Sequence, residues 1–429
     1  MKSNSISWGR YPRHQCKVHN YDKTKIVNSK SILPFGNGRS YGDSCMADEL
    51  IDIKNLNKFI HFDDKNGNLT LQAGVTLKEI INVIIPRGWF LKINPGTKLI
   101  TVGGAIAADV HGKNHHKQGC FSECVKWIKL VTANGDEIIC SKDQNAEYFF
   151  TTCGGMGLTG VIIEAKLELK KINSVNINQT TVKTKNLFET FEIFESIKDE
   201  EYSVAWIDCL AKKNDIGRSK VIFGDFLNDG NLNTKAKRKI IVPFEFPSFF
   251  LNSFSVKLFN WFYYHVQLKK EETSVVDYDT FFFPLDKILN WNKIYGKKGF
   301  IQYQFILPKK TSFEGLKEVL ELISESGKGS FLAVLKLYGK ANKNWLSFPI
   351  EGYSLALDFK IDRDLFKLLD KLDDVVVRYD GRIYLAKDAR VSKDVFEAGY
   401  SKIEDFRMFR KKTGLNKKFN SLQSLRLEI

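Results

Sequence analysis

A dense polar cluster at residues 111–116 (HGKNHH) directly follows a glycine-rich stretch that begins at Pro95. Imidazole and amine groups can move protons or hold an anion near neutral pH. Gly96, Gly103 and Gly104 precede the cluster, and glycine lets the main chain approach a ligand and present its N–H groups to phosphate. The stretch is therefore either a site for a phosphate-bearing cofactor with chemistry at its edge or a glycine-rich surface loop beside a chance histidine cluster.

Two further glycine loops support the first interpretation. They are residues 35–44 (FGNGRSYGDS) and residues 153–160 (CGGMGLTG), and the latter runs into a predicted strand at 161–169. Three such loops indicate one nucleotide-binding domain. None has the GxGxxG pattern between a strand and a helix, so a Rossmann fold is disfavoured.

The elements that must position these loops are mixed. The spacing predicts a strand at 50–53, a hairpin from 59–62 to 69–73 around Asn66-Gly67, and a second hairpin from 125–132 to 137–140. Thr76 is expected to cap a helix that runs to about Ile85. In the second half we expect helices at 313–326 and 364–374 and strands at 331–338 and 353–359.

This pattern predicts an α+β protein of more than one domain, which suits a length of 429 residues. The glycine loops stop near Lys170, so residues 172–380 are expected to form a second domain inserted in the first. Residues 381–429 carry another polar motif at 384–390 (YLAKDAR) and are expected to return to the first domain.

Composition narrows the class of partner. The formal net charge is +15, which favours an anionic partner such as nucleic acid, a lipid headgroup or a phosphorylated substrate. No nucleic-acid-binding motif is apparent. Seven cysteines without zinc-type pairing, and a start without an apolar signal region, predict reduced thiols in a cytoplasmic protein.

Residues 240–266 (IIVPFEFPSFFLNSFSVKLFNWFYYHV) are unusually aromatic and have basic shoulders, namely Lys235, Lys237, Arg238 and Lys239 before them and Lys269 and Lys270 after them. Prolines and charges interrupt any run that could span a bilayer. The segment either lies on a membrane surface or contributes its aromatic side chains to the core.

Together the motifs resemble the flavin-dependent oxidoreductases of the vanillyl-alcohol-oxidase type, specifically the decaprenylphosphoryl-β-D-ribose 2′-oxidase branch. The resemblance is carried by residues 38–43, 95–116 and 154–160, and further along by 282–286 (FFPLD), 290–292 (NWN), 302–304 (QYQ), 346–349 (LSFP) and 386–388 (AKD). It covers essentially the whole chain. Where better-known members have cysteine before Val-Asp-Phe, this chain has Ala356-Leu357-Asp358-Phe359.

The resemblance implies a two-part FAD-binding domain of residues 1–171, completed by a C-terminal segment of residues 381–429, with an inserted α+β substrate domain of residues 172–380. Tyr41 stands where many relatives attach FAD through a histidine, which implies noncovalent FAD. The implied cofactor-binding residues are Gly36, Asn37, Gly38, Arg39, Ser40, Tyr41, Pro95, Gly96, Thr97, Val102, Gly103, Gly104, Ala107, His111, Gly112, Asn114, Gly155, Gly157, Leu158, Thr159, Gly160 and Val161.

The resemblance also implies the reacting groups. Lys387 is expected to contact the reacting hydroxyl, since a lysine in a partly dry pocket with positive neighbours has a lowered pKa. His111 is either a second acid–base group or an ordering element of the flavin loop. The implied substrate residues are Tyr41, Lys113, Gln302, Gln304, Lys336, Tyr384 and Lys387. His115 and His116 lack partners at ligand spacing, so no metal is predicted.

The function implied is oxidation of the 2′-hydroxyl of a polyprenyl-phosphoryl-β-D-ribofuranose to the 2′-keto sugar, the first half of epimerisation to an arabinose donor for cell-envelope polysaccharide. The implied partners are this lipid-linked substrate, a separate NAD(P)H-dependent reductase and, peripherally, the inner face of the plasma membrane. The alternatives are a sugar-1,4-lactone or alditol oxidase, which acts on neutral substrates, and a flavin-binding scaffold without catalysis.

Overall fold

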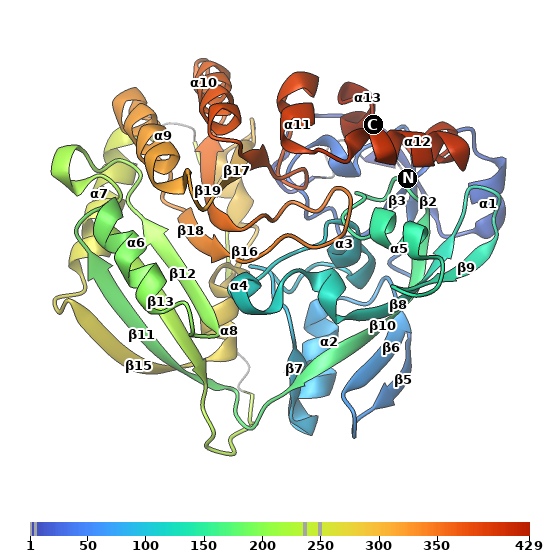
Figure 1. Cartoon of the computed structure of the whole chain (residues 1–429), viewed down its shortest axis with the longest axis horizontal. Helices are drawn as coiled ribbons and strands as arrows, with labels where there is room; N and C mark the ends of the chain where they lie inside the picture. The colour runs from blue at the N-terminus through green and yellow to red at the C-terminus, as the bar shows by residue number, and fades with distance from the viewer. Residues whose placement is uncertain (1, 4–6, 235–237, 248–250) are drawn as a thin grey trace.

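Three β-sheets organise the chain (Figure 1), and helices pack between and over them. The computed structural model describes residues 2–3, 7–234, 238–247 and 251–429. Its mixed helices and sheets confirm the α+β class.

Two of the sheets belong to the N-terminal part. The first has the order β1 (Lys2–Ser3), β2 (Cys16–Asn20), β4 (Glu49–Asp52) and β3 (Leu33–Phe35). The second has the order β5 (Phe59–Asp63), β6 (Asn68–Gln72), β10 (Val161–Lys171), β8 (Val125–Val131) and β9 (Glu137–Cys140), and β7 (Trp89–Leu91) pairs with β10. The helices here are α1 (Lys23–Asn28), α2 (Leu77–Ile84), α3 (Val102–Ala107), α4 (His115–Gln118) and α5 (Ala146–Thr152).

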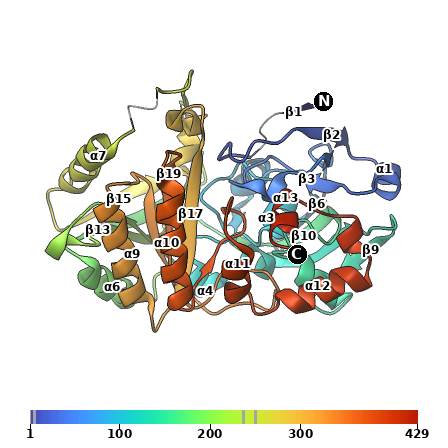
Figure 2. The same ribbon diagram turned by 90° about the horizontal axis from the view of Figure 1, so that it is seen from above.

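The third sheet has eight strands. Their order is β15 (Glu271–Asp277), β11 (Asn176–Thr184), β13 (Ser219–Phe226), β12 (Tyr202–Ile207), β18 (Ala333–Tyr338), β19 (Gly352–Lys360), β17 (Phe300–Pro308) and β20 (Arg382–Ile383). Helices α6 (Leu187–Ser196), α9 (Ser312–Ser326) and α10 (Leu365–Arg378) cover one face (Figure 2). Helices α7 (Ser253–His265) and α8 (Tyr278–Phe282) and the short pair β14 (Ile240–Ile241) and β16 (Ile288–Leu289) complete this part.

The two faces of the eight-stranded sheet differ in chemistry because successive side chains of a strand point to opposite sides. Ala205, Leu335, Leu355 and Phe305 belong to the apolar core under the helices. The residues between them pair across the strands in register and share the other face, namely Lys220, Trp206, Val334, Lys336, Ser354, Ala356, Asp358, Gln302 and Gln304. This second face carries three of the seven predicted substrate residues, Lys336, Gln302 and Gln304.

Three helices end the chain, namely α11 (Lys393–Gly399), α12 (Ile403–Lys412) and α13 (Leu422–Arg426). Helix α11 packs against α10 and β20, whereas α12 and α13 pack back onto the N-terminal part. The buried guanidinium of Arg410 donates to the main-chain oxygen of Leu158 at 3.2 Å, and to those of Phe419 and Ile429. Arg426 forms ion pairs with both Asp43 and Asp388. These contacts tie the end of the chain to the first and third glycine loops.

Most elements predicted from the sequence are confirmed. Both hairpins form, and Thr76 caps α2 with a reciprocal bond to Glu79. Helix α10 continues four residues beyond the predicted end at 374 because Leu368, Leu372, Val375 and Val376 keep one apolar stripe in the core. The domain boundaries stay predictions; β20 lies just beyond the expected boundary at 380 and still pairs with β17.

The segment at 240–266 has both exposed and buried side chains where the structure describes it. Phe254 is 74% exposed and Trp261 is 54% exposed, so these two are not core, whereas Val242 and Val256 are buried. Lys235, Lys237, Phe249 and Phe250 lie outside the described residues. Among the helices that are described, none combines the length and apolarity needed to cross a membrane.

We predict that Arg410→Ala lowers the free energy of unfolding by about 3 kcal/mol, because several buried carbonyl oxygens lose their donor at once. Chemical denaturation of the purified protein measures the change. Arg378→Ala is the matched control, since this arginine is exposed on α10 and pairs only with Glu318. Equal stability of the two variants would contradict the assigned role of Arg410.

Candidate active site

The three glycine loops meet in space although they are far apart in sequence. Asn37 donates its side-chain amide to the Leu99 carbonyl at 3.1 Å, which joins the first loop to the second. The N–H of Met156 donates to the Ala107 carbonyl at 2.8 Å, which joins the third to the second. The structure therefore brings the predicted cofactor segments 36–41, 95–114 and 155–161 into one region.

Gly42 holds the first loop against the polar motif of the C-terminal segment. A Cβ at this position would lie 1.8 Å from the carbonyl oxygen of Asp388, so only glycine permits the approach. The N–H of Tyr41 donates to the Ala386 carbonyl at 3.0 Å. This contact sets the Nζ of Lys387 3.8 Å above the centre of the Tyr41 ring.

Asp388 fixes the backbone that carries Lys387. Its carboxylate is buried and accepts the N–H groups of Arg390 and Val391, the amide of Gln423 and the guanidinium of Arg426. A carboxylate with this many donors holds its turn rigidly. The lysine side chain is thus directed by a structured turn.

Asp358 is the acidic neighbour of Lys387. It is buried and accepts a hydrogen bond from Gln302 at 2.6 Å, while its other oxygen has no partner among the described residues. Burial raises the pKa of Asp358 to about 7. Burial lowers the pKa of Lys387 to about 7, with Lys336 adding to the effect and Asp358 opposing it. A proton can therefore move at this pair near neutral pH.

Lys336 and Lys113 add positive charge near Lys387, and the three side chains form a lysine cluster. Burial lowers the pKa of Lys336 to about 8. Burial, with the charge of Lys336, lowers the pKa of Lys113 to about 7, and its amine donates to the Phe281 carbonyl at 2.5 Å. All three lysines are half-buried. Such a cluster favours an anionic ligand.

His111 lies between the lysines and the aromatic wall. Its Nε2 is 3.2 Å from the side-chain amide of Gln304, and its ring packs against those of Tyr338, Phe348 and Tyr384. Burial and the charge of Lys336 hold the pKa of His111 well below its usual range. The imidazole is therefore neutral, and its Nδ1 has no partner in the described part of the chain.

His115 and His116 have structural partners. The N–H of Gly339 donates to Nδ1 of His115 at 3.2 Å, and Nε2 of His116 lies 2.8 Å from the Glu200 carbonyl. No group of three or more metal-binding side chains occurs among residues that the structure describes. These two histidines position the loop at 111–116.

The same loop is anchored by Asp109. This buried carboxylate accepts hydrogen bonds from the amides of Asn342 and Asn344, the hydroxyl of Ser347 and the N–H of Ser122. It has φ of 39°, an uncommon conformation for a residue other than glycine. The contacts join α3 to the segment at 342–347 and so fix where His111 and Lys113 emerge.

The residues around the glycine loops fit FAD. Buried polar atoms without a partner among the described residues gather there, namely Nε of Arg39, Oδ1 of Asn94, Nδ1 of His111 and Oδ1 of Asn114. A Cβ on Gly96 would meet no atom within 4 Å, so the second loop borders open space. Buried polar atoms normally have partners, and a flavin nucleotide supplies both donors and acceptors.

Two predicted cofactor residues have their hydroxyls engaged elsewhere. Thr97 donates to Asp286 at 2.7 Å, and the buried Thr159 donates to Thr152 at 2.9 Å. Their main-chain groups are the parts that can face a cofactor. The roles of the other cofactor and substrate residues stay predictions, although the structure brings Tyr41, Lys113, Gln302, Gln304, Lys336, Tyr384 and Lys387 into one connected cluster with His111.

Asp358 was not among the predicted site residues. The signal was present in the alternation of β17 and β19, because Gln302 pairs with Asp358 and Gln304 with Ala356 on one sheet face. A charged residue at an inward position beside predicted substrate residues marks a site.

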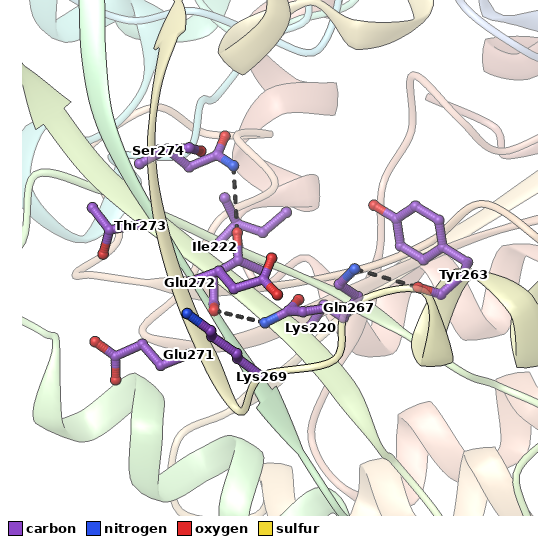
Figure 3. Close-up of a pocket in the computed structure, with 11 residues that line it drawn as sticks. Lys220, Ile222, Tyr263, Gln267, Lys269, Glu271, Glu272, Thr273 and Ser274 are labelled. Carbon is purple, nitrogen blue, oxygen red and sulfur yellow. Dashed lines mark hydrogen bonds between the residues drawn. The ribbon is translucent and has the colours of Figure 1, made fainter.

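A separate recess of about 560 Å³ lies on the sheet at β15, β11 and β13 (Figure 3). It contains none of the predicted site residues. Lys220 reaches across it to the Tyr263 carbonyl at 3.3 Å, as Figure 3 shows, and so anchors α7 to the sheet. We assign it no part in the chemistry of the lysine cluster.

Comparisons with known proteins identify the family of the chain. Residues 20–141 match the FAD binding domain family. The chain is 33% identical to decaprenylphosphoryl-β-D-ribose oxidase of Mycolicibacterium smegmatis, over 99% of this chain and 97% of that protein. It is 26% identical to an uncharacterized Streptomyces coelicolor protein over 83% of this chain and all of that protein. D-arabinono-1,4-lactone oxidase of Candida glabrata is 23% identical over 44% of this chain and 37% of its own length. The chain therefore belongs to the decaprenylphosphoryl-β-D-ribose oxidase family of FAD-dependent oxidoreductases.

Proposed function

We propose that this enzyme oxidises the 2′-hydroxyl of a polyprenyl-phosphoryl-β-D-ribofuranose to the 2′-keto sugar, using noncovalently bound FAD. The observation that carries the proposal is the cluster of Lys387, Lys336 and Lys113 near Gln304 and His111. A phosphodiester suits the additional cations, and the amides suit sugar hydroxyls. The relative with 33% identity is named for oxidation of such a sugar.

Residues 1–171 and 381–429 are proposed to form the two-part FAD-binding domain around an inserted substrate domain of residues 172–380. The ion pairs of Arg426 with Asp43 and Asp388, and the bonds of Arg410 to the third glycine loop, support this arrangement. The loops at 36–41, 95–104 and 155–161 would hold the cofactor, which supplies the hydride acceptor when bound.

In the proposed mechanism Lys387 removes the hydroxyl proton. The neutral amine would accept that proton while the sugar carbon loses its hydrogen as hydride and becomes a carbonyl carbon. Bound FAD would supply the acceptor for that hydride. Asp358 then stabilises the new ammonium group of Lys387. The positive charge on Lys387 lowers the pKa of Asp358 and so favours the carboxylate, which attracts the ammonium. Gln302 holds the carboxylate, and neutral His111 and Gln304 orient the sugar.

The keto sugar is proposed to pass to a separate NAD(P)H-dependent reductase. We place the enzyme on the cytoplasmic side of the plasma membrane, in peripheral contact with it. All seven cysteines are unpaired, as is usual in a reducing compartment.

A sugar-1,4-lactone or alditol oxidase is the second candidate. The partial similarity to D-arabinono-1,4-lactone oxidase favours it. A neutral substrate supplies no negative charge to Lys113 and Lys336. Keeping their positive charges in a desolvated environment without a counter-charge costs free energy.

The first test concerns the cofactor. Tyr41 occupies the usual attachment position and its phenol has a strongly raised pKa because it is buried, so we expect no covalent bond. Acid precipitation of the purified protein should leave the yellow colour in the supernatant. Colour retained by the washed pellet would refute noncovalent binding.

The second test concerns Lys387. Lys387→Met should retain FAD and reduce the rate of anaerobic flavin reduction by about 100-fold or more, the usual scale for a positioned acid–base group. Because burial lowers the pKa of Lys387 to about 7, the wild-type rate should rise with pH through about 7 as the amine loses its proton. The variant should lack this rise.

Lys367→Met is the matched control, since Lys367 is exposed and pairs only with Asp364. It should behave as wild type. A Lys387→Met enzyme that reduces its flavin at the wild-type rate would remove Lys387 from the mechanism.

The third test separates the two candidate functions. Lys336→Met should raise KM for a short-chain phosphoryl-ribose about tenfold or more, the effect of losing about 1.4 kcal/mol of binding. Turnover of D-arabinono-1,4-lactone is expected to be slow in wild type and no slower in the variant. Efficient oxidation of the lactone, with no effect of the substitution on the phosphorylated sugar, would favour the lactone oxidase.

A further inference from the structure

Helix α7 carries large apolar side chains on its outward face, unlike an ordinary surface helix. Phe254, Leu258, Trp261 and Phe262 follow helical spacing on this face, and each is more than half exposed. The inward face is mixed: it carries the buried Val256 and Asn260 and the half-buried Tyr263, together with Gln267 just beyond the helix. Solvent exposure of this stripe is unfavourable unless something covers it.

Specific contacts hold the helix in this orientation. Asn260 is buried and donates to Asp208 at 2.8 Å, and Tyr263 packs against Trp206 with ring centres 4.7 Å apart. The hydroxyl of Tyr264 donates to the Thr184 carbonyl at 3.1 Å. The apolar stripe therefore points outward because the opposite side is bonded to the sheet.

Further exposed apolar side chains flank α7 in the sequence. Leu268 is 90% exposed after the helix, and Ile240, Ile241 and Phe244 are exposed before it. In Figure 2, α7 lies on the side of the eight-stranded sheet opposite α9 and α10. Exposed basic residues occur in and around the helix in the sequence, namely Arg238, Lys239, Lys257, Lys269 and Lys270, of which Lys270 pairs with Glu189. An apolar surface with basic margins is complementary to an anionic lipid bilayer.

The same sheet face leads from α7 to the reacting groups. Trp206 and Lys220, which contact α7, lie on β12 and β13, and Lys336 lies on the neighbouring strand β18 on the same face. Neighbouring strands are about 4.8 Å apart. Helix α7 is therefore only a few strands away from Lys336 and the other two lysines of the cluster.

A second route of contacts joins the two places. Phe259 of α7 packs on Phe331, Phe331 on Tyr295, Tyr295 on Phe300 and Phe300 on Tyr41, with successive ring centres between 4.3 and 5.8 Å apart. Lys387 lies over the last of these rings. A continuous line of aromatic contacts thus links the helix to the site.

We propose that the outward face of α7, with Leu268 and its basic margins, docks on an anionic bilayer and receives the polyprenyl tail while the sugar reaches Lys387. The proposal rests on the proposed function for the identity of the substrate, but the docking itself is measured without any substrate. The stripe enters the interface to a depth of about 5–10 Å, as amphipathic helices do.

The test uses the FAD-loaded enzyme and vesicles of phosphatidylglycerol and phosphatidylcholine. Wild type should sediment with them and be released by salt, and it should bind vesicles of phosphatidylcholine alone at least about tenfold more weakly, because the basic margins need anionic headgroups. Replacing Phe254, Trp261 and Phe262 with serine should abolish sedimentation. Lys257→Glu with Lys269→Glu should weaken it while leaving the apolar stripe intact.

The matched control replaces Phe188 and Met408 with serine, because these side chains are equally exposed on other helices. It should sediment as wild type. All variants should keep wild-type Tm and turnover of a water-soluble short-chain phosphoryl-ribose, while the α7 variants should lose turnover of the lipid-linked substrate in vesicles.

Wild type that does not sediment, or a triple variant that sediments normally, overturns the docking proposal. A concentration-dependent dimer that the triple variant dissociates, without vesicle binding, shows that a second copy covers the helix instead. Normal vesicle binding with no turnover of either phosphoryl-ribose refutes the proposed function and leaves the docking surface in place.

Discussion

Desolvation of an amine beside a carboxylate is the constraint on which the site depends. Burial lowers the pKa of Lys387 to about 7, and the charge of Lys336 adds to this effect. Asp358 opposes the shift. A lysine in water would stay protonated and could not accept a proton. Burial shifts the pKa of Asp358 upward, and its hydrogen bond with Gln302 and the charge of Lys387 oppose this shift.

The surrounding structure keeps this arrangement in place. Gly42 allows the first glycine loop to contact Asp388, and Asp388 in turn fixes the turn that carries Lys387. Arg410 and Arg426 bind the C-terminal segment to the N-terminal glycine loops. The end of the chain therefore returns to its beginning, which brings the turn that carries Lys387 against the first glycine loop. In the proposed function, the C-terminal helices position Lys387 by holding this turn.

Local patterns in the sequence predicted much of the fold. The Asn-Gly turn, the capping box at Thr76 and the glycine loops act over a few residues, and the corresponding elements are present. The order of the eight strands could not be predicted, because it depends on pairings between strands that are far apart in the sequence. One such pairing joins β12 to β18. The participation of Asp358 depends on that register. The orientation of α7 depends equally on distant partners such as Asp208, so spacing alone left its aromatic residues between core and surface.

The most direct test of the central claim is anaerobic stopped-flow reduction of the enzyme-bound flavin by a short-chain phosphoryl-β-D-ribose, with hydrogen or deuterium at C2′. Abstraction of hydride from that carbon predicts rapid bleaching of the flavin absorption, slowed several-fold by deuterium. Absence of bleaching, or bleaching that is equally fast with both isotopes under conditions where chemistry limits the rate, would contradict oxidation at C2′.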